Sequence, residues 1–520
     1  MSVLSRVLQK LGYEKAPVVK MGRRTYAAAM LNRLTQDWFT QILSADQELK
    51  ADLRRLRGAS RSLVRDNAEA SRYVQMLAEN VVGHKGIQLQ MQFMTTRETP
   101  AATVNEKVEA AWEEWGHPEN ASADGRLSWV EIQHLVVKEL AQGGECLVRM
   151  IRGADNDFGF ALQIIDPDQL DETFGGALPV KLPNGNEVRM GVEVDPVYAK
   201  PVAYHLWSQH PSEYGSPQRK RVRILAEDLL HLYVVLRPGQ SRGVPWFAPV
   251  LIAHKMCAAY EEAEITAARI GASNMAAVTF DAEKAGSIAE PLAGESDIPM
   301  ELSPGQFLRL GPGEGLAATD FGHPSTAFGP FIKNIKRSIA AGLNVAYTSL
   351  TGDLEAVNYS SIRAGLLSER DFFRVMQTWL STHFHRVVFR EWTKYASITG
   401  HIQPKQPRDY MMAASWKPRG WKWVDPLNDV QAAALAVQEG FATRSDICAE
   451  QGTDFEENID RRAHEEAYAL EQNVLLGAAK PVVPRQPDTM SGDPSQPASG
   501  PAAPDAAPAR SLRLARSALT

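Results

Sequence analysis

The chain has 520 residues, of which 44% are hydrophobic and 23% are charged, as is typical of a globular protein. This length exceeds what a single hydrophobic core normally supports, so we expect two or more domains. The formal net charge of −6 argues against a protein that grips nucleic acid tightly, because such binding depends on neutralising phosphates with basic side chains.

Targeting and redox signals are also missing from the sequence. No apolar run approaches the roughly 20 residues that span a bilayer, and the apolar stretch at the N-terminus is too short for a signal peptide. Cys146, Cys257 and Cys448 lie far apart and fit neither a disulfide framework nor a zinc spacing. We therefore expect a protein of a reducing cytoplasm, with no membrane partner.

The first twenty residues are interpreted as a short arm, and residues 21–93 as mainly helical. Within this region a basic run extends from Lys50 to Arg65 and includes Arg57 and Arg61. Its simplest interpretation is a solvated helix face that pairs with acids elsewhere. A contact between subunits and phosphate binding are the alternatives.

Helices are predicted over residues 104–116 and 129–142, and Gly143-Gly144 should end the second one. The pattern then changes to strands, which are predicted at Cys146–Ile151, Phe160–Ile165, Val202–Trp207 and Leu229–Val235. Asn184-Gly185 is typical of a hairpin turn. Asp166, Asp168 and Asp171 could form a cation site, but Asp166-Pro167 also begins a turn without any ion, and we adopt that interpretation.

A long helix is predicted over residues 249–274, which are rich in alanine and free of proline after Pro249. Residues 281–320 contain eight Asp and Glu, with several prolines and glycines, and should be turn-rich. A second helix follows, with apolar residues every four positions from Phe331 to Leu343. Residues 347–359 are predicted to be a loop, and another long helix should run from Ser360 to about Ser397.

Short apolar faces predict further helices after residue 425, with Thr443 as a plausible N-cap. After Gly477 the chain becomes rich in proline, alanine and serine, which is typical of a disordered tail. We expect residues 481–520 to be sensitive to proteases and unnecessary for assembly.

Several motifs, taken together and in order, resemble the portal proteins of lambda-type tailed bacteriophages. They are R-x-Y-A-A-A at 24–29, R-x-L-V-R-D-N at 61–67, N-V-V-G at 80–83, R-G-V-P-W-F-A-P-V-L at 242–251 with the Tyr-Glu-x-Ala-Glu and A-R-I-x-A runs that follow, W-V-D-P-L at 423–427 and G-F-A-T-R-S-D-I at 440–447. The resemblance covers roughly residues 20–470.

This resemblance implies an α+β portal fold with a sheet-containing wing, a two-helix stem, a small clip, a long transverse helix and a helical crown. The implied division is an N-terminal arm at 1–20, wing at 21–248, first stem helix at 249–274, clip at 275–325, second stem helix at 326–345, tunnel loop at 346–359, wing and long helix at 360–424, crown at 425–477 and tail at 478–520.

The resemblance also implies a non-enzymatic role as a ring, expected to have twelve subunits, at one capsid vertex of a virion assembled in the host cytoplasm. Double-stranded DNA would pass through the channel during packaging and ejection. The implied partners are the terminase large subunit, the major capsid and scaffold proteins and the head-tail connector protein. A net acidic protein is compatible with such a conduit, which must let DNA slide.

An enzyme remains the alternative class, namely a metal-dependent nuclease of the packaging machinery. The sequence has no G-x-x-x-x-G-K-[ST], G-x-S-x-G or H-E-x-x-H motif, and only the Asp166, Asp168 and Asp171 group resembles clustered metal ligands. His383 and His385 should point to different faces of a helix. Trp416, Trp421 and Trp423 could stack on bases, but burial between domains is the simpler reading. We expect no catalytic residue, cofactor or metal site.

The second stem helix carries Lys333, Lys336 and Arg337 on one face, at spacings of three and four residues. We expect this face to be free, either to line the channel or to meet a neighbour's acids, for which Glu261, Glu262 and Glu264 are the candidates. The acidic segment 281–320 should repel DNA at the narrow end of the ring. In the tunnel loop, Thr351 and Asn358 are expected to make weak polar contacts with DNA.

Overall fold

The computed structural model describes residues 42–94, 101–175, 179–213, 219–272, 276–280, 314–318, 328–355, 358–405, 407–423, 425–472 and 474. The arm expected at 1–20, the tail expected at 478–520 and most of the clip expected at 275–325 lie outside these residues. The chain divides into one unit that ends at Asp454 and a second that begins at Phe455.

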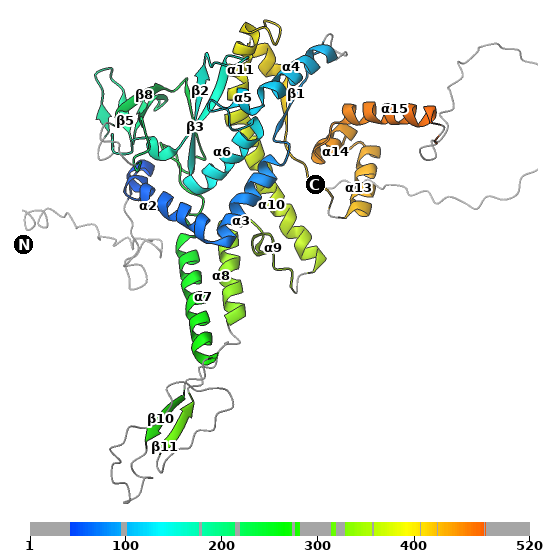
Figure 1. Cartoon of the computed structure of the whole chain (residues 1–520). Coiled ribbons are helices and arrows are strands. Elements are labelled where there is room, and N and C mark those ends of the chain that lie inside the picture. Colours follow the sequence, from blue (N-terminus) through cyan, green and yellow to red (C-terminus); the bar gives the residue numbers. More distant parts are fainter. Residues whose placement is uncertain are drawn as a thin grey trace, which may run out of the picture. The chain divides into compact units, whose positions relative to one another are not determined.

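Helices dominate the first unit (Figure 1). They are α2 (Ala45–Asp66), α3 (Ala68–Leu77) with a π-helical turn (Ala78–Val82), α4 (Ala102–Trp115), α5 (Pro118–Ala121), α6 (Trp129–Gly143), α7 (Leu251–Ala272), α8 (Phe328–Gly342), α9 (Tyr347–Thr351), α10 (Tyr359–Leu380), α11 (Arg386–Ile398), α12 (Pro407–Ala413), α13 (Pro426–Gln438) and α14 (Arg444–Glu450). Among the described residues, every helix is too short or too polar to cross a bilayer.

Local signals set the ends of α6. Ser128 and Glu131 form a capping box at its start, which satisfies two of the unpaired N–H groups there. Gly144 ends the helix with a φ of 86°, a conformation that glycine adopts without strain. The predicted boundary at Gly143-Gly144 is therefore confirmed.

The described strands form two larger antiparallel sheets and two separate strand pairs. β3 (Phe160–Ile165), β2 (Glu145–Arg152) and β9 (Leu229–Tyr233) are neighbours in that order. The second sheet has the order β4 (Val180–Lys181), β5 (Glu187–Arg189), β6 (Val192–Val194), β7 (Pro201–Trp207) and β8 (Arg221–Leu225). All four predicted strands are confirmed, and Asn184-Gly185 lies in the β4–β5 turn; β6 and β8 were not predicted.

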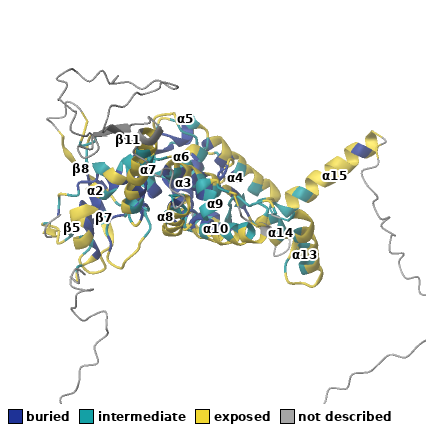
Figure 2. Ribbon diagram, turned by 90° about the horizontal axis from the view of Figure 1, so that it is seen from below, coloured by how far each residue is buried: buried dark blue, intermediate teal, exposed yellow. Residues whose placement is uncertain are grey.

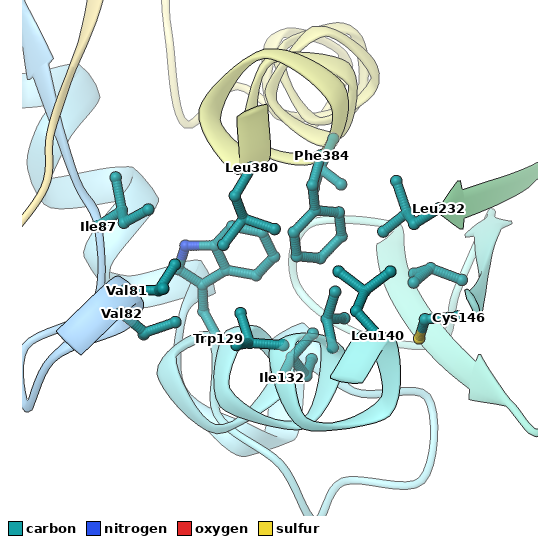
Figure 3. Packing of buried hydrophobic residues seen from close by; sticks show 14 of the residues in the cluster. Val81, Val82, Ile87, Trp129, Ile132, Leu140, Cys146, Leu232, Leu380 and Phe384 are labelled. Atoms are coloured by element: carbon teal, nitrogen blue, oxygen red, sulfur yellow. The ribbon is translucent and has the colours of Figure 1, made fainter. Parts of the chain in front are cut away.

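β2 separates two hydrophobic cores because its side chains alternate between the faces of the sheet. Val148 and Met150 belong to the larger core, which the helices cover. Leu147 belongs to a smaller core together with residues of the five-stranded sheet. Figure 3 shows part of the larger core, where Trp129 of α6 lies opposite Leu380 and Phe384.

The long helix expected from Ser360 to about Ser397 is present as α10 and α11, joined by a π-helical turn (Ser381–His385). Within this turn the two histidines differ as expected. His385 is buried and its Nδ1 lies 3.2 Å from the carbonyl oxygen of Leu380, whereas His383 is exposed.

Two local expectations were wrong. The segment 347–359 is not simply a loop, because Tyr347–Thr351 forms the short helix α9, which Gly352 ends with a φ of 74°. The segment 281–320, expected to be turn-rich, contains the strand β11 (Glu314–Ala318), which pairs antiparallel with β10 (Ala276–Phe280) just before that segment. The last strand pair joins β1 (Gln88–Met91) to β12 (Ala414–Lys417), which are distant in sequence.

The helices expected after residue 425 are confirmed as α13, α14 and, in the second unit, α15 (Phe455–Glu471). Thr443 caps α14 in a capping box with Asp446, as predicted. α15 is exposed along most of its length (Figure 2). Arg462 and Glu466 form an ion pair one turn apart on this helix, with 2.8 Å between Nε and Oε1.

Candidate functional site

The antiparallel pair of helices α7 and α8 carries most of the residues singled out in the sequence (Figure 1). The helices approach closely at Gly342, where an added Cβ would lie 2.5 Å from Cγ1 of Val250. Farther along, the rings of Tyr260 and Phe331 meet edge to face, with 5.3 Å between their centroids. The predicted apolar stripe of α8 is buried at Ile339 and Leu343, but Phe331 at its other end is 51% exposed.

Lys336 is not free, contrary to the expectation for this basic face. Its Nζ lies 2.7 Å from Oε1 of Glu69 on α3 and 3.0 Å from Oε1 of Glu261 on α7. Burial opposes the charge of Lys336, but the hydrogen bonds to both carboxylates outweigh it and raise its pKa. Lys336 therefore ties three helices together, and Glu261 is already engaged within its own chain.

Lys333 is paired within the chain as well. Its Nζ lies 3.2 Å from a carboxylate oxygen of Asp353 and 3.2 Å from one of Glu355, both just beyond α9. Hydrogen bonds to Glu355 and Asp353 raise the pKa of Lys333. The hydroxyl of Tyr347 also donates to Asp353, at 2.8 Å. These contacts join α8 to the segment expected to be the tunnel loop.

Arg337 is the remaining cation of this face. Its guanidinium lies over the ring of Tyr347, with 5.6 Å to the centroid, and Nη1 is 3.5 Å from Oδ1 of Asn334. Its side chain forms no ion pair with a carboxylate in the described part of the chain. Glu262 of α7 is exposed, while Glu264 is half-buried.

Thr351 and Asn358 both have local structural roles. The Thr351 hydroxyl donates to the carbonyl of Tyr347 at 2.8 Å and accepts from the amide of Asp353 at 3.2 Å. Asn358 caps α10, where its Oδ1 accepts from the amide of Ser361 at 2.8 Å. These contacts explain why such residues stand at the ends of α9 and α10 without reference to a ligand.

The basic run of α2 is only in part the solvated face that the sequence suggested. Arg54 and Arg55 are exposed, but Arg57 is 2% exposed and Arg61 is half-buried. Nη1 of Arg57 lies 2.5 Å from Asp168, and Nη1 of Arg61 lies 2.6 Å from the other oxygen of the same carboxylate. The run pairs with acids as expected, but its centre does so inside the protein.

The aspartates considered as metal ligands are held by arginines. Asp166 accepts from Arg61 at 2.9 Å and also caps the turn that begins at Pro167, as predicted. Asp171 lies apart from them and pairs with Arg221 at 2.5 Å. Asp166 and Asp168 do gather near His210 with possible ligand atoms within 4.8 Å, but their carboxylates already accept from guanidinium groups. The turn predicted at Asp166-Pro167 is present.

Glu145, which the sequence analysis did not single out, is the centre of a buried ion network. It is fully buried and accepts from Arg57 at 2.6 Å, from Arg242 at 2.5 Å and from the backbone amide of Gly243 at 2.8 Å, and it lies 2.8 Å from Nε2 of His231. Burial alone would raise the pKa of Glu145, but Arg242 and Arg57 outweigh it and lower the pKa well below its usual value. A single acid at the start of a strand carries no sequence signal for such a role.

The three tryptophans do not form one cluster. Trp416 packs among aromatic residues of the larger core, including Trp112 at 6.0 Å between centroids. Trp421 stacks on Phe373, with centroids 6.3 Å apart, and donates to Oδ1 of Asn80 at 3.0 Å. Trp421 and Trp423 are half-buried beside a cavity lined by arginines.

The amino-acid sequence matches a known protein family. Residues 31–377 match the family described as phage portal protein, lambda family. The chain belongs to the lambda family of phage portal proteins. The matched range includes α7, α8 and most of α10, so the helix pair lies inside the part that defines the family.

Relatives from three phages share this family membership. The chain is 33% identical to the probable portal protein of Halomonas phage phiHAP-1, over 83% of this chain and 84% of that protein. It is 22% identical to the portal protein of Escherichia phage N15, over 82% and 87% of the two chains. It is also 22% identical to portal protein B of Escherichia phage lambda, over 83% and 86%.

A solved structure aligns with this chain at a lower sequence identity. A chain from the virion of a native gene transfer agent particle matches with a TM-score of 0.45 and 14% identity, covering 77% of this chain and 93% of that one. A likeness of this size does not by itself establish a common fold. The family assignment of this portal protein rests on the sequence matches.

Proposed function

We propose that the protein forms a closed ring at one capsid vertex of a tailed phage, through which double-stranded DNA enters and leaves. The family match over residues 31–377 is the observation that carries the proposal. In this role the ring docks the terminase large subunit during packaging and later the head-tail connector protein, while major capsid and scaffold proteins contact it in the assembling head. It is a structural component of the virion, assembled in the host cytoplasm.

The surface of α7 supports the ring. This helix leaves large apolar side chains uncovered, since Ile252 and Met256 are 75% and 68% exposed. Uncovered apolar residues in a row on one helix are typical of a surface that another copy covers. Head-to-tail contacts between such surfaces close into a ring only when the rotation between subunits permits it.

The domain assignment is part of the same proposal. α7 and α8 correspond to the stem, β10 and β11 to part of the clip, and α9 with the segment up to Asn358 to the tunnel loop. α10 and α11 correspond to the long transverse helix, and α13 to α15 to the crown. The two sheets and the helices packed on them form the wing.

Native mass spectrometry of the purified protein tests the proposal, with negative-stain microscopy of the same sample. The expected result is a single closed ring, with twelve subunits as the expected number. A monodisperse monomer or dimer at high concentration would contradict it. Deletion of residues 481–520 should leave the ring intact, and loss of rings would show that the tail is structural.

Arg337 distinguishes a lumen role from an interface role, because Lys333 and Lys336 have partners within the chain. If Arg337 faces the channel, Arg337→Glu should leave rings intact and lower packaging or retention of DNA. If it meets a neighbour's Glu262, the same change should weaken rings, and Glu262→Lys should partly restore them. Lys107→Glu on the exposed side of α4 is the matched control, since it reverses one charge away from the helix pair.

A further inference from the structure

One face of α10 carries three arginines beside a cavity. Arg363, Arg370 and Arg374 are separated by seven and four residues, which places them along one side of the helix. They line a cavity of about 330 Å³ together with Trp421 and Trp423, and α13 and α14 supply its apolar wall. This cavity with its arginines and tryptophans is called the Arg–Trp pocket below.

Trp421 is a fixed platform for two of the arginines. The guanidinium carbons of Arg370 and Arg374 lie 5.8 and 5.7 Å from the centroid of its ring. The indole itself is held by stacking on Phe373 and by its hydrogen bond to Asn80. Stacking occupies the face of a guanidinium and leaves its edge, with the N–H donors, available for a planar or tetrahedral oxyanion.

Close backbone contacts hold the segment that carries Trp421. Gly420 lies against Gly452, where an added Cβ would meet the Gly452 nitrogen at 2.2 Å. On the other side, Gly83 leaves room for the side chain of Arg419, which would lie 3.0 Å from a Cβ at that position. Arg419 donates to the carbonyl of Glu79. The pocket is therefore positioned by glycines from three separate parts of the chain.

The positive charge of the pocket is incompletely balanced. Arg363 pairs with Asp429 at 2.7 Å, and Arg374 has only an exposed partner, Asp371, at 3.2 Å. In the described residues Arg370 and Arg419 form no ion pair, and the polar contact of Arg370 is to the carbonyl of Lys422 at 3.3 Å. Burial, followed by the charges of Arg374 and Arg419, lowers the pKa of Arg370. Three arginines line the pocket against two acids, Asp429 and Glu450, so an anion that binds between the guanidinium groups relieves their repulsion.

We propose that the Arg–Trp pocket binds a phosphate group of DNA. Guanidinium edges match phosphate oxygens in a bidentate manner, and the ring of Trp421 holds two of these guanidinium groups side by side. The rest of the lining is Glu450 and the apolar wall, so the basic part of the pocket is small. It suits one phosphate group and not a long stretch of DNA backbone. The choice of DNA as the source of the phosphate rests on the proposed function.

The test measures binding of a short fluorescein-labelled DNA duplex to the assembled full-length protein, by anisotropy at about 50 to 200 mM NaCl. Arg370→Glu with Arg374→Glu should weaken binding at least tenfold and reduce the slope of log K against log salt by about 0.9, as the loss of one phosphate contact predicts. Arg370→Lys with Arg374→Lys keeps the positive charge but loses the planar guanidinium that binds a phosphate with two N–H groups. This variant should bind DNA several-fold more weakly, with nearly the same salt slope. Arg54→Glu with Arg55→Glu, on the exposed side of α2, is the control of equal charge and should change affinity far less.

Each alternative outcome overturns the proposal in a recognisable way. If the glutamate variant binds the duplex like the unmodified protein, DNA does not use the pocket. If the unmodified protein binds inorganic phosphate, and the lysine variant loses phosphate binding but still binds the duplex normally, the pocket is a site for a free anion. If a poly-glutamate peptide displaces the duplex and binds more tightly, the partner is an acidic protein segment. Rings are checked by native mass spectrometry throughout, so failure of the unmodified protein to form rings counts against the proposed function and not against the pocket.

Discussion

Arg242 and Glu145 form a fully buried ion pair, with 2.5 Å between Nη2 and Oε1 and no exposed surface on either side chain. Glu145 begins β2, and Arg242 precedes the turn that leads into α7. The pair therefore fixes the entry to the first long helix against the sheet. Arg57 on α2 completes the contact from the N-terminal side.

Removing one member of the Arg242–Glu145 pair should destabilise the folded protein. Arg242→Met leaves the Glu145 carboxylate buried with less compensation, and we expect the free energy of unfolding to fall by roughly 3–5 kcal/mol. Chemical denaturation measures it. Arg65→Met is the control, because Arg65 pairs with Asp66 at the surface and its loss should change stability far less. Equal effects of the two changes would contradict the role of the buried pair.

His385 should make the protein sensitive to mild acid. Burial lowers its pKa to about 3, against 6.5 when unfolded, with a smaller opposite effect from its hydrogen bond to Leu380. Because the folded pKa is the lower one, protonation of His385 favours the unfolded state. The free energy of unfolding is therefore at its full value above pH 6.5 and decreases as the pH falls from there toward 3.

The prediction compares the unmodified protein with His385→Phe, which cannot titrate and fits among aromatic neighbours. Between about pH 7.5 and pH 5.5 the unmodified protein should lose about 1.4 kcal/mol more of its free energy of unfolding than the variant. Other buried histidines contribute to both proteins and cancel in the comparison. Parallel pH profiles would show that folding does not lower the pKa of His385.

Gly144 should tolerate no side chain, for two separable reasons. Its φ of 86° disfavours other residues, and an added Cβ would lie 2.4 Å from the Val244 carbonyl carbon. Gly125 has a φ of 67° but open space around it, so Gly125→Ala measures the conformational part alone. We expect Gly125→Ala to cost about 1 kcal/mol and Gly144→Ala about 2–4 kcal/mol, measured by denaturation. Similar losses would mean that the backbone near Pro245 moves to admit the methyl group.

Lys336 and Lys333 should differ although they stand one turn apart on α8. Lys336→Ala removes a partner from both Glu69 and Glu261 at the junction of three helices, and should lower the free energy of unfolding by about 1–3 kcal/mol. Lys333→Ala removes a more exposed pair, with Glu355 82% exposed, and should lower the free energy of unfolding less than Lys336→Ala does. The reverse order would indicate that the Lys333 contacts to Asp353 order the segment after α9.

Local signals in the sequence were enough to predict most helices and strands of this protein. Caps such as Ser128 with Glu131 and Thr443 with Asp446 act between residues three apart, so they can be recognised before the fold is known. The same holds for the hairpin turn at Asn184-Gly185. Short strands such as β6 and β8 were missed because three to five residues carry too little periodic pattern.

The charged sites depended on the tertiary structure. The spacing of Lys333, Lys336 and Arg337 places them on one face of a helix, but it does not indicate what lies opposite. Glu69, which binds Lys336, comes from a helix far earlier in the chain.

The buried network illustrates the same limit. Arg57 and Glu145 are 88 residues apart, and neither stands in a motif that announces an ion pair. By itself the sequence determined the family, the order of the longer elements and the ends of helices such as α6, because motifs, caps and periodicity are local along the chain. Only the tertiary structure decided which arginines are buried and which acids they meet, because electrostatic pairing depends on distance in space.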